Sequence, residues 1–359
     1  MADSKQAPLD AEAAAKAAFT SVQDKPFPDD IFTAPELRWA VIGCGVIANQ
    51  MAQSLALDGR KLAGVANRTL SKAQAFAEQY GIEKVYETVE DLYADPNIDA
   101  VYITTPHNTH ITYLRAALAA GKHVLCEKAI TLNSAELDEA RAIADEHNVV
   151  LMDATTVLHM PLYQELRRRM DAGEFGRMNL AQLNFGSYKE YGDLTNRFYN
   201  RNLAGGAMLD IGVYALSVMR LFMASQPVEV VSLGNTCETG VDVAGGIVCR
   251  NAEQQLGVVS LTLHSKQPKR SVISFDNCYV EVNEYPRADH ATIVWTADGH
   301  REEVAAGTEA YALCYEMADL EQAVAGDDSK RELLDYASDV MELMTKLRAD
   351  WGVVYPEEE

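Results

Sequence analysis

Hydrophobic and polar positions follow different patterns in the two halves of the chain. Between residues 40 and 152, short apolar runs typical of buried strands alternate with segments whose apolar positions recur at helical spacing. Such alternation indicates right-handed crossovers and a parallel, doubly wound sheet, so we predict an α/β fold for this half. The predicted strands are residues 40–43, 61–66, 84–86, 99–104, 123–126 and 149–152, and the predicted helices begin near residue 46 and cover residues 70–80, 109–120 and 134–146.

Beyond residue 155, strand-like runs follow one another with turns between them. This pattern favours a large, mostly antiparallel sheet in an α+β domain. We therefore divide the chain into an N-terminal extension (1–36), a nucleotide-binding domain (37–155) and an α+β domain (156–359). The predicted strands are residues 228–233, 246–249, 256–264, 271–275, 279–282 and 292–296, and the predicted helices are residues 162–171, 207–223, 311–324 and 333–351.

The composition narrows the class of protein. The chain has 359 residues, of which 48% are hydrophobic, and this is enough for two domains with a sizeable core. A formal net charge of −22 argues against a nucleic-acid partner, because binding to phosphate backbones needs clustered Lys and Arg. A phosphorylated cofactor would likewise need local positive charge, so single Arg and Lys residues in the first domain become informative.

The cysteines and the N-terminal segment indicate a cytoplasmic protein. Six cysteines are scattered without a C-x-x-C pair or a Cys/His ligand spacing, so we predict no metal site and no disulfide framework. The first 36 residues lack a secretory signal, and they contain a predicted helix at residues 11–19 and a linker at residues 25–30. No run looks long and apolar enough to span a bilayer, and we expect no membrane partner.

A glycine turn after the first predicted strand carries the clearest functional signal. Gly43, Gly45 and Ala48 match the dinucleotide fingerprint G-x-G-x-x-G/A. The first glycine allows the tight turn, the second lets the backbone approach a pyrophosphate, and the third small residue keeps the helix close to the strand. The N–H groups of Gly45, Val46 and Ile47 would face the phosphates. The alternative is a turn that binds nothing, but its place between a strand and a helix favours a cofactor.

The end of the second predicted strand indicates which cofactor is bound. In NAD sites an acidic residue about twenty positions after the fingerprint binds the ribose hydroxyls, whereas an Arg suits a 2′-phosphate. Here Asn67 is followed by Arg68. No carboxylate would repel the phosphate, and a guanidinium can pair with it in a bidentate way. We therefore favour NADP(H); NAD(H) is the alternative if Arg68 is only a solvated turn residue.

Two further loops at strand ends supply polar groups. Glu127 and Lys128 directly follow the fifth predicted strand, and the carboxyl ends of such strands face the ligand crevice. We expect Lys128 at the nicotinamide, where its amine can bind a substrate oxygen and stabilise negative charge on it. In the loop after the fourth strand, Thr105, Pro106 and His110 are expected to line the ribose and nicotinamide. The alternatives are a solvated lysine and an ordinary helix-start loop.

A third candidate lies in the segment from Gly205 to Tyr214. On a helix, Asp210 and Tyr214 are four residues apart and share one face. A carboxylate and a phenol there can bind a polyol, with Tyr214 giving or taking the proton. The unperturbed pKa of tyrosine is about 10, and we expect a nearby Lys128 ammonium to lower the pKa of Tyr214. An amphipathic helix with a packed Tyr and a capped Asp is the alternative.

These motifs together resemble one enzyme family. The glycine turn, the TP-x-x-x-H loop, the EK dipeptide and the GG-A-x-x-D-x-G-x-Y segment occur in the order seen in the glucose-fructose oxidoreductase, inositol dehydrogenase and MocA family. The likeness runs from about residue 37 to residue 356. It implies a Rossmann domain followed by an α+β domain with a large open sheet, often used for oligomerisation. We therefore expect a homodimer or a higher homo-oligomer.

The resemblance also implies residue roles. Lys128 takes the place of the lysine in an E-K-P motif at the nicotinamide, and Asp210 and Tyr214 take the places of a D-x-x-x-H pair. Ala129 replaces the proline, which we expect to relax the backbone after Lys128. Tyrosine instead of histidine resembles the branch containing glucose-fructose oxidoreductase, dimeric dihydrodiol dehydrogenase and NADP-linked xylose dehydrogenase, a branch that tends to use NADP.

Other positions bear on the substrate. Members near the dihydrodiol branch tend to carry an aromatic residue and an Arg where this chain has Thr156 and Leu158, which weakens any transfer of their substrate preference. The segment 188–201, with Lys189, Arg197, Tyr199 and Arg201, is expected to contribute to the substrate pocket.

The sequence thus predicts a cytoplasmic NADP-dependent oxidoreductase that transfers a hydride between nicotinamide and a sugar, cyclic polyol or related diol or carbonyl. Tyr214 would handle the proton, Lys128 would bind and polarise the reacting oxygen, and Asp210 would orient the substrate or the pair. One alternative is an NAD-dependent dehydrogenase of sugars or inositol. Another alternative is a cofactor-binding sensor or partner protein without catalysis. The presence of Lys128, Asp210 and Tyr214 argues against it.

Overall fold

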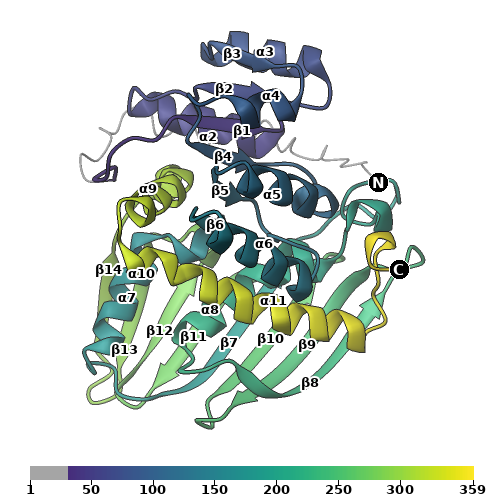
Figure 1. Cartoon of the computed structure of the whole chain (residues 1–359). Helices are drawn as coiled ribbons and strands as arrows, with labels where there is room; N and C mark the ends of the chain where they lie inside the picture. The colour runs from purple at the N-terminus through teal and green to yellow at the C-terminus, as the bar shows by residue number, and fades with distance from the viewer. Residues whose placement is uncertain (1–30) are drawn as a thin grey trace, which may run out of the picture.

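The computed structural model describes residues 31–359 and divides them mainly between two sheets (Figure 1). The helix predicted for residues 11–19 and the linker predicted for residues 25–30 lie outside the described residues. This helix and this linker therefore stay predictions.

The first sheet is parallel throughout, and its strand order is β3-β2-β1-β4-β5-β6. Doubly wound sheets of this order bind dinucleotides where the order reverses, next to β1 and β4. The strands β1 and β4 are fully buried, as expected for strands that helices cover on both faces. The prediction of a doubly wound parallel sheet is confirmed. The elements are β1 (Trp39–Ile42), α2 (Val46–Leu57), β2 (Gly64–Ala66), α3 (Leu70–Tyr80), β3 (Lys84–Tyr86), α4 (Val89–Ala94), β4 (Ala100–Ile103), α5 (His110–Ala119), β5 (His123–Cys126), α6 (Ser134–Glu146) and β6 (Leu151–Asp153).

The second sheet has the order β14-β13-β12-β11-β7-β10-β9-β8. Only the pair of β7 and β10 is parallel, so the prediction of a mostly antiparallel sheet is confirmed. The sequence pattern missed β7 and β14, although the buried positions Ala181, Leu183 and Phe185 of β7 alternate with more exposed ones, as in a strand with one open face. The elements are α7 (Pro161–Asp171), β7 (Met178–Gly186), α8 (Val213–Phe222), β8 (Pro227–Thr236), β9 (Asp242–Asn251), β10 (Leu256–Thr262), β11 (Gln267–Phe275), β12 (Cys278–Asn283), β13 (His290–Trp295), β14 (Arg301–Ala305), α9 (Ala312–Val324), α10 (Asp328–Arg331) and α11 (Leu333–Asp350).

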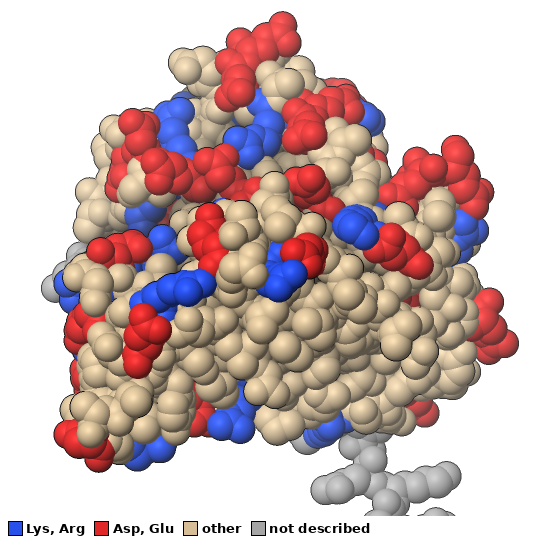
Figure 2. All heavy atoms as spheres, turned by 90° about the horizontal axis from the view of Figure 1, so that it is seen from below, with Lys and Arg blue, Asp and Glu red and all other residues tan. Residues whose placement is uncertain are grey.

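Helices cover one face of the large sheet, and the other face is open (Figure 1). Helix α8 packs against β7, and α11 packs against α8 and against α6 and β6 of the Rossmann domain. The view onto the open face shows a broad area with few charged side chains (Figure 2). Exposed apolar side chains on β8 include Val231 and Leu233, which are 75% and 83% exposed.

One segment corrects an expectation about membranes. The helical stretch Arg201–Phe222 is long and apolar enough to cross a bilayer by length and composition, so the expectation that no run qualifies is wrong on this criterion. However, 83% of its apolar window is buried inside the protein. Helix α8 belongs to this stretch and packs against β7 and α11. We therefore interpret the stretch as a core helix.

Helix α9 follows the large sheet in sequence but packs on the first sheet. Its apolar side chains, among them Leu313, Met317 and Leu320, share a core with residues of β1 and α2. Its buried Glu321 accepts hydrogen bonds from the indole of Trp39 (3.0 Å) and from Arg60 (3.1 Å). Side-chain packing therefore crosses the domain boundary that we predicted at residue 155. The position of that boundary stays a prediction.

Candidate active site

The glycine turn has the geometry that a dinucleotide needs. Gly43 has a φ of +106°, and a Cβ there would lie 2.6 Å from the hydroxyl oxygen of Thr104, so glycine is required. At Gly45, the N-cap of α2, a Cβ would meet no atom within 4 Å. Within the described residues, the N–H groups of Gly45, Val46 and Ile47 find no acceptor. Open space and free donors at a helix start fit a pyrophosphate.

Positive charge lies close to this turn. Asn67 follows β2 and donates to the carbonyl oxygen of Thr69 (3.0 Å), while Arg68 is exposed and has no side-chain partner among residues 31–359. Burial raises the pKa of the Cys44 thiol in the turn to about 11, and the Lys72 ammonium opposes this rise. Lys72, which the sequence analysis did not single out, therefore adds a second cation on this side.

Two segments 82 residues apart meet at Lys128. Its ammonium donates to the backbone carbonyl of Asp210 (2.7 Å) and to the Oδ1 atom of the same residue (3.2 Å). The ammonium also lies 4.9 Å from the ring centroid of Tyr214. The Tyr214 hydroxyl has no hydrogen-bond partner in the described part of the chain and stays available to a ligand. The structure thus brings the three expected catalytic residues together.

The backbone before Tyr214 differs from the α-helix that we predicted. Residues Met208–Gly212 form a π-helical turn, a feature that occurs frequently at functional sites, and α8 begins only at Val213. The preceding glycines allow close packing, because a Cβ on Gly205 would lie 2.6 Å from the carbonyl oxygen of Arg197. Gly206 has a φ of +128°. The π-turn aims both the carbonyl and the carboxylate of Asp210 at Lys128.

The pKa values follow from burial and from this cluster of charges. Burial alone would raise the pKa of Asp210, but the charges of Lys128, Arg197 and Lys189 outweigh it and hold the pKa well below its usual range. Burial lowers the pKa of Lys128, but Asp210 and Tyr214 outweigh it, so that pKa is raised. Both groups are therefore charged near neutrality.

The pKa of Tyr214 corrects our expectation. Lys128 does act to lower it, as predicted, but burial has the larger effect and the net pKa of Tyr214 is raised. The phenol is therefore protonated near neutrality, and this form donates a proton rather than accepting one.

Several expected cofactor residues hold loops in place instead of facing a ligand. His110 is fully buried, with its ring nitrogens 2.8 Å from the carbonyl oxygen of Thr105 and 3.0 Å from that of Ala129. It ties the loop containing Thr105 and exposed Pro106 to the loop after Lys128. The expectation that the His110 side chain lines the cofactor is therefore corrected to a positioning role.

The end of β5 is held in a similar way. The Glu127 carboxylate accepts a hydrogen bond from the hydroxyl of buried Tyr102, and it also accepts from the backbone N–H of Lys128 (3.3 Å). Burial raises the pKa of Glu127. The peptide bond between Lys128 and Ala129 is cis, although Ala129 replaces the proline of the family motif.

The expected substrate residues separate into two groups. Arg197 lies 3.5 Å from Oδ1 of Asp210, and half-buried Lys189 lies close enough to lower the pKa of that carboxylate. By contrast, Arg201 donates to the carbonyl oxygen of Val354 and to Glu359, and the fully buried Tyr199 donates to the backbone of Lys189. Arg201 and Tyr199 thus have structural contacts, so we withdraw them as substrate-contacting residues.

His107 belongs to the same loop after β4, whose polar side chains were expected to line the cofactor. Its ring nitrogen lies 3.3 Å from the carbonyl oxygen of Ala204, joining the loop after β4 to the segment that leads to Asp210. Burial, together with the charge of Lys128 and the proximity of His110, lowers the pKa of His107 to about 3. His107 is therefore neutral. The sequence signal for His107 was its place in this loop, just beyond the carboxyl end of β4.

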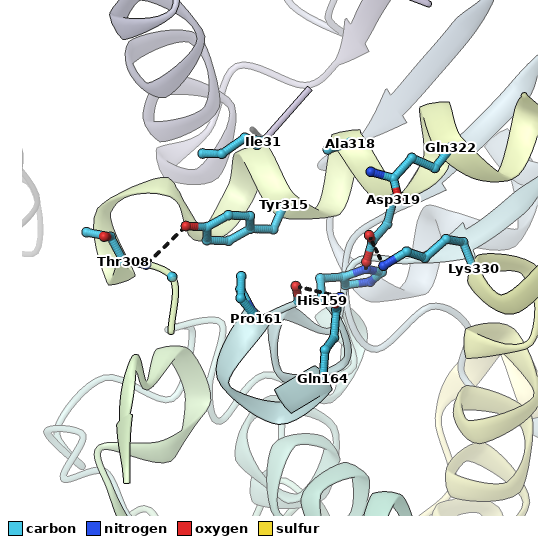
Figure 3. A pocket seen from close by; sticks show the side chains of 11 residues that line it. Ile31, His159, Pro161, Gln164, Thr308, Tyr315, Ala318, Asp319, Gln322 and Lys330 are labelled. Atoms are coloured by element: carbon cyan, nitrogen blue, oxygen red, sulfur yellow. Dashed lines mark hydrogen bonds and ion pairs between the residues drawn. The ribbon is translucent and has the colours of Figure 1, made fainter. Parts of the chain in front are cut away.

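A separate cavity of about 340 Å³ lies between α9, α10 and the start of α7 (Figure 3). None of the residues discussed above lines it. On one side His159 lies 2.9 Å from Asp319, which in turn accepts from Lys330 at 2.6 Å. The other ring nitrogen of His159 lies 2.8 Å from the carbonyl oxygen of Asp153 at the end of β6. These contacts join α9 and α10 to the edge of the first sheet. Within residues 31–359, no group of three or more His, Cys, Asp or Glu side chains could hold a metal ion.

Both halves of the chain are similar to known protein families and to characterised proteins. The description "Oxidoreductase family, NAD-binding Rossmann fold" matches residues 37–155, and the GFO/IDH/MocA C-terminal domain matches residues 163–281. Trans-1,2-dihydrobenzene-1,2-diol dehydrogenase of Mus musculus is 33% identical over 244 residues, which are 66% of this chain and 72% of the relative. The enzyme of the same name from Sus scrofa is 28% identical over 341 residues, covering 90% of this chain and 99% of the relative.

Solved structures share the same architecture. A 3-ketoreductase from Actinomadura kijaniata in complex with NADP and TDP-benzene has a TM-score of 0.74 at 25% identity, covering 88% of this chain and 98% of that chain. Levoglucosan dehydrogenase in complex with NADH and levoglucosan has a TM-score of 0.76 at 19% identity over 87% of this chain and 97% of that chain, a likeness of fold alone. This chain therefore belongs to the Gfo/Idh/MocA family of oxidoreductases, with an NAD-binding Rossmann fold in its N-terminal half.

Proposed function

We propose that the chain is an NADP-dependent oxidoreductase that transfers a hydride between nicotinamide and a carbinol or carbonyl carbon of a sugar, cyclic polyol or related diol. The observation that carries this proposal is the convergence of Lys128, Asp210 and Tyr214 from the two halves of the chain. The names of the relatives, which act on a dihydrodiol, and of a neighbour bound to levoglucosan support a small hydroxyl-bearing or keto-bearing substrate.

Each of the three residues has a chemical role that its environment supports. When bound, the nicotinamide supplies the hydride chemistry. In the reductive direction, the protonated Tyr214 phenol donates its proton to the substrate oxygen, and in oxidation the phenolate takes the proton back. The charged Lys128 ammonium donates a hydrogen bond to the same oxygen and stabilises its developing negative charge. Asp210 holds the Lys128 amine in place through its backbone carbonyl and its carboxylate.

A substrate panel tests the reaction. The full-length protein would be assayed with aldoses, cyclic polyols, levoglucosan and trans-dihydrobenzenediol, each with NADP⁺ and with NAD⁺ in separate reactions, and reduced cofactor would be followed by absorbance. We expect turnover with at least one sugar or polyol. Weak activity on the dihydrodiol is expected, because Thr156 and Leu158 are packed in the core and offer no aromatic or guanidinium group. Failure of every sugar, neutral or anionic, and of every polyol and diol with both cofactors would contradict the proposed function.

Arg68 supports the preference for NADP(H) over NAD(H). It is exposed, unpaired within the described residues, and follows β2, where the adenosine ribose of a Rossmann cofactor binds. We expect Arg68→Ala to weaken NADPH binding by roughly ten- to a hundredfold, the size of a charge-assisted hydrogen bond, and to leave NADH binding unchanged. Fluorescence titration of both cofactors would measure this.

The control is Arg115→Ala, which removes an exposed arginine paired with Glu139 on α5 and α6. Equal loss of NADPH and NADH binding in Arg68→Ala, or no loss of either, would contradict the 2′-phosphate assignment and favour the NAD-dependent alternative.

The open face of the large sheet supports self-association as a homodimer or higher oligomer. Five exposed apolar side chains lie on three adjacent strands: Val228, Val231 and Leu233 on β8, Val248 on β9 and Leu256 on β10. Large exposed apolar patches mark interaction surfaces. All six cysteines are free, which supports a cytoplasmic location for the assembly.

A charge placed on this face tests the association. We expect Leu233→Glu to weaken self-association by about tenfold or more, because burying an unpaired carboxylate in an interface is unfavourable. The side chain is 83% exposed, so the fold should be unaffected. Sedimentation velocity over a concentration series would measure the shift, with Val354→Glu at an exposed position off the sheet as the control. A chain that is monomeric before mutation would contradict this proposal.

A further inference from the structure

We propose that the substrate carries an anionic group, a carboxylate or a phosphate, and that Lys189 and Arg197 bind this group beside the reaction centre. The inference rests on the proposed hydride transfer and adds the charge class of the substrate. It follows from an excess of positive charge around one carboxylate, in a chain whose net charge is −22.

Three cations surround Asp210. Lys128 lies 3.2 Å and Arg197 lies 3.5 Å from the same oxygen, Oδ1. Lys189 lies close enough to act on the same carboxylate. The neighbouring His107 is neutral, because its pKa is lowered to about 3. One carboxylate thus faces three positive charges, and Lys128 makes two contacts with Asp210. A single negative charge cannot balance all three cations, so positive charge remains on the side of Lys189 and Arg197.

The backbone of Lys189 is fixed on both sides. Its N–H donates to the carbonyl oxygen of Leu263 (2.8 Å), and its carbonyl oxygen accepts from the hydroxyl of Tyr199 (2.9 Å). The ring of Tyr199 packs edge-on against Tyr191, with centroids 5.0 Å apart. Lys189 is therefore presented from an anchored backbone and not from a free surface loop, which reduces the entropy lost when its ammonium binds a ligand.

The charged ends of Lys189 and Arg197 share one aromatic ring. The Lys189 ammonium and the Arg197 guanidinium each lie 4.1 Å from the ring centroid of Phe198. Lys189 is half-buried, and no carboxylate in the described part of the chain pairs with it. Lys269, another cation near Lys189, is already paired with Glu284 at 2.9 Å. Burial and the neighbouring cations lower the pKa of Lys189, while Asp210 partly offsets the effect.

Two like charges beside one aromatic ring repel each other, and an anion between or beside them would relieve this repulsion. The Arg197 side chain is 59% exposed, so a ligand can reach it. The phosphates of the cofactor are expected elsewhere, at the glycine turn and at Arg68. A carboxylate or phosphate on the substrate would therefore complete the charge balance and orient the substrate next to Lys128 and Tyr214.

The experiment compares three sugars that differ in one group. D-glucose is neutral, D-glucuronate carries a carboxylate, and D-glucose 6-phosphate carries a phosphate. Each would be titrated calorimetrically into the full-length protein saturated with NADP⁺, at low and at raised NaCl concentration. We expect at least one anionic sugar to bind about tenfold or more tightly than glucose, as for charge-assisted hydrogen bonds, and the better of the two identifies the anionic group. Salt should weaken only the anionic ligand.

Variants assign the effect to residues. Lys189→Gln should weaken binding of the anionic sugar by about tenfold, while binding of glucose changes little. Lys189→Arg keeps the charge and should restore most of the preference. Lys346→Gln serves as the matched control, because it removes an exposed lysine paired with Asp350 on α11. Arg197→Gln should act in the same direction as Lys189→Gln. Thermal melting of each variant would confirm that the fold is retained.

The outcomes separate this inference from the proposed function. Equal or undetectable binding of all three sugars overturns the anionic-substrate inference, as does an anionic preference that both Lys189→Gln and Arg197→Gln leave intact. Turnover of neutral sugars without any anionic preference sinks this inference and leaves the hydride-transfer proposal standing. A Lys189-dependent preference without turnover of any sugar or polyol, with either cofactor, sinks the hydride transfer and leaves the anion site standing.

Discussion

Lys128→Ala is expected to lower kcat by about a hundred- to a thousandfold, the range seen when one donor to a developing oxyanion is removed. The structure gives the reason, because the Lys128 ammonium lies 4.9 Å from the Tyr214 ring centroid and is held by two oxygens of Asp210. NADPH binding should stay within a few-fold of its original strength, because the free N–H groups at the start of α2 do not depend on Lys128. Steady-state kinetics and NADPH titration would measure the two effects separately.

Lys128→Ala also removes one of the positive charges that stabilise the buried Asp210 carboxylate. Removing one partner of a buried ion pair costs about 3–5 kcal/mol where no other cation is present. Here Arg197 still contacts Asp210, so we expect a smaller loss of stability, measured by denaturant unfolding. The control is Lys266→Ala, at an exposed lysine on the loop after β10. An unchanged kcat in a folded Lys128→Ala protein would remove this residue from the mechanism.

Tyr214→Phe is expected to lower kcat by about a hundred- to ten-thousandfold in both directions, the usual contribution of a general acid or base. The substitution removes only the hydroxyl, which has no partner in residues 31–359, so the packing of the ring against Phe185 should persist. Melting temperature should therefore stay nearly constant. A structural role alone predicts the opposite, namely a lower melting temperature with little change in kcat.

The direction of the Tyr214 pKa shift predicts how the activity depends on pH. The pKa of Tyr214 is raised, so the protonated phenol is present at neutral pH and is lost only as the pH rises through that raised pKa. Reduction of a ketone, which needs the phenol, should be flat near neutrality and fall at high pH. Oxidation of an alcohol, which needs the phenolate, should rise with pH over the same range. Both pH profiles should lose this feature in Tyr214→Phe and keep it in Tyr279→Phe, which changes a half-buried tyrosine on β12 of the large sheet.

The local elements of the first half could be predicted from the sequence with good accuracy. The strand of β1, the glycine turn and the start of α2 at Val46 all follow from neighbouring residues, because apolar runs and glycines restrict the backbone where they stand. In the second half, β7 was missed although its positions alternate between buried and more exposed ones. What a local pattern does not show is that β7 pairs with β10 and β11 in the interior of the sheet.

The roles of individual polar side chains were less predictable. His110, Tyr199 and Arg201 were expected at ligands, yet each contacts backbone carbonyls of the protein. The partners of His110 and Arg201, at Ala129 and Val354, come from other segments. A sequence motif specifies a residue type but not the partner that satisfies it, and buried polar groups take whichever partner the packing provides. The pKa of Tyr214 was misjudged for a related reason, since burial is a property of the packed chain.

The sequence alone determined the parallel nucleotide-binding sheet, its glycine turn and the identity of the residues able to do chemistry, since these depend on short-range patterns of hydrophobicity and backbone freedom. Only the tertiary structure decided that Lys128 meets Asp210 and Tyr214, and that Lys189 and Arg197 gather around the same carboxylate. Those contacts join segments tens of residues apart, and their geometry depends on the docking of the large sheet's helices against the Rossmann domain. No local pattern encodes that docking.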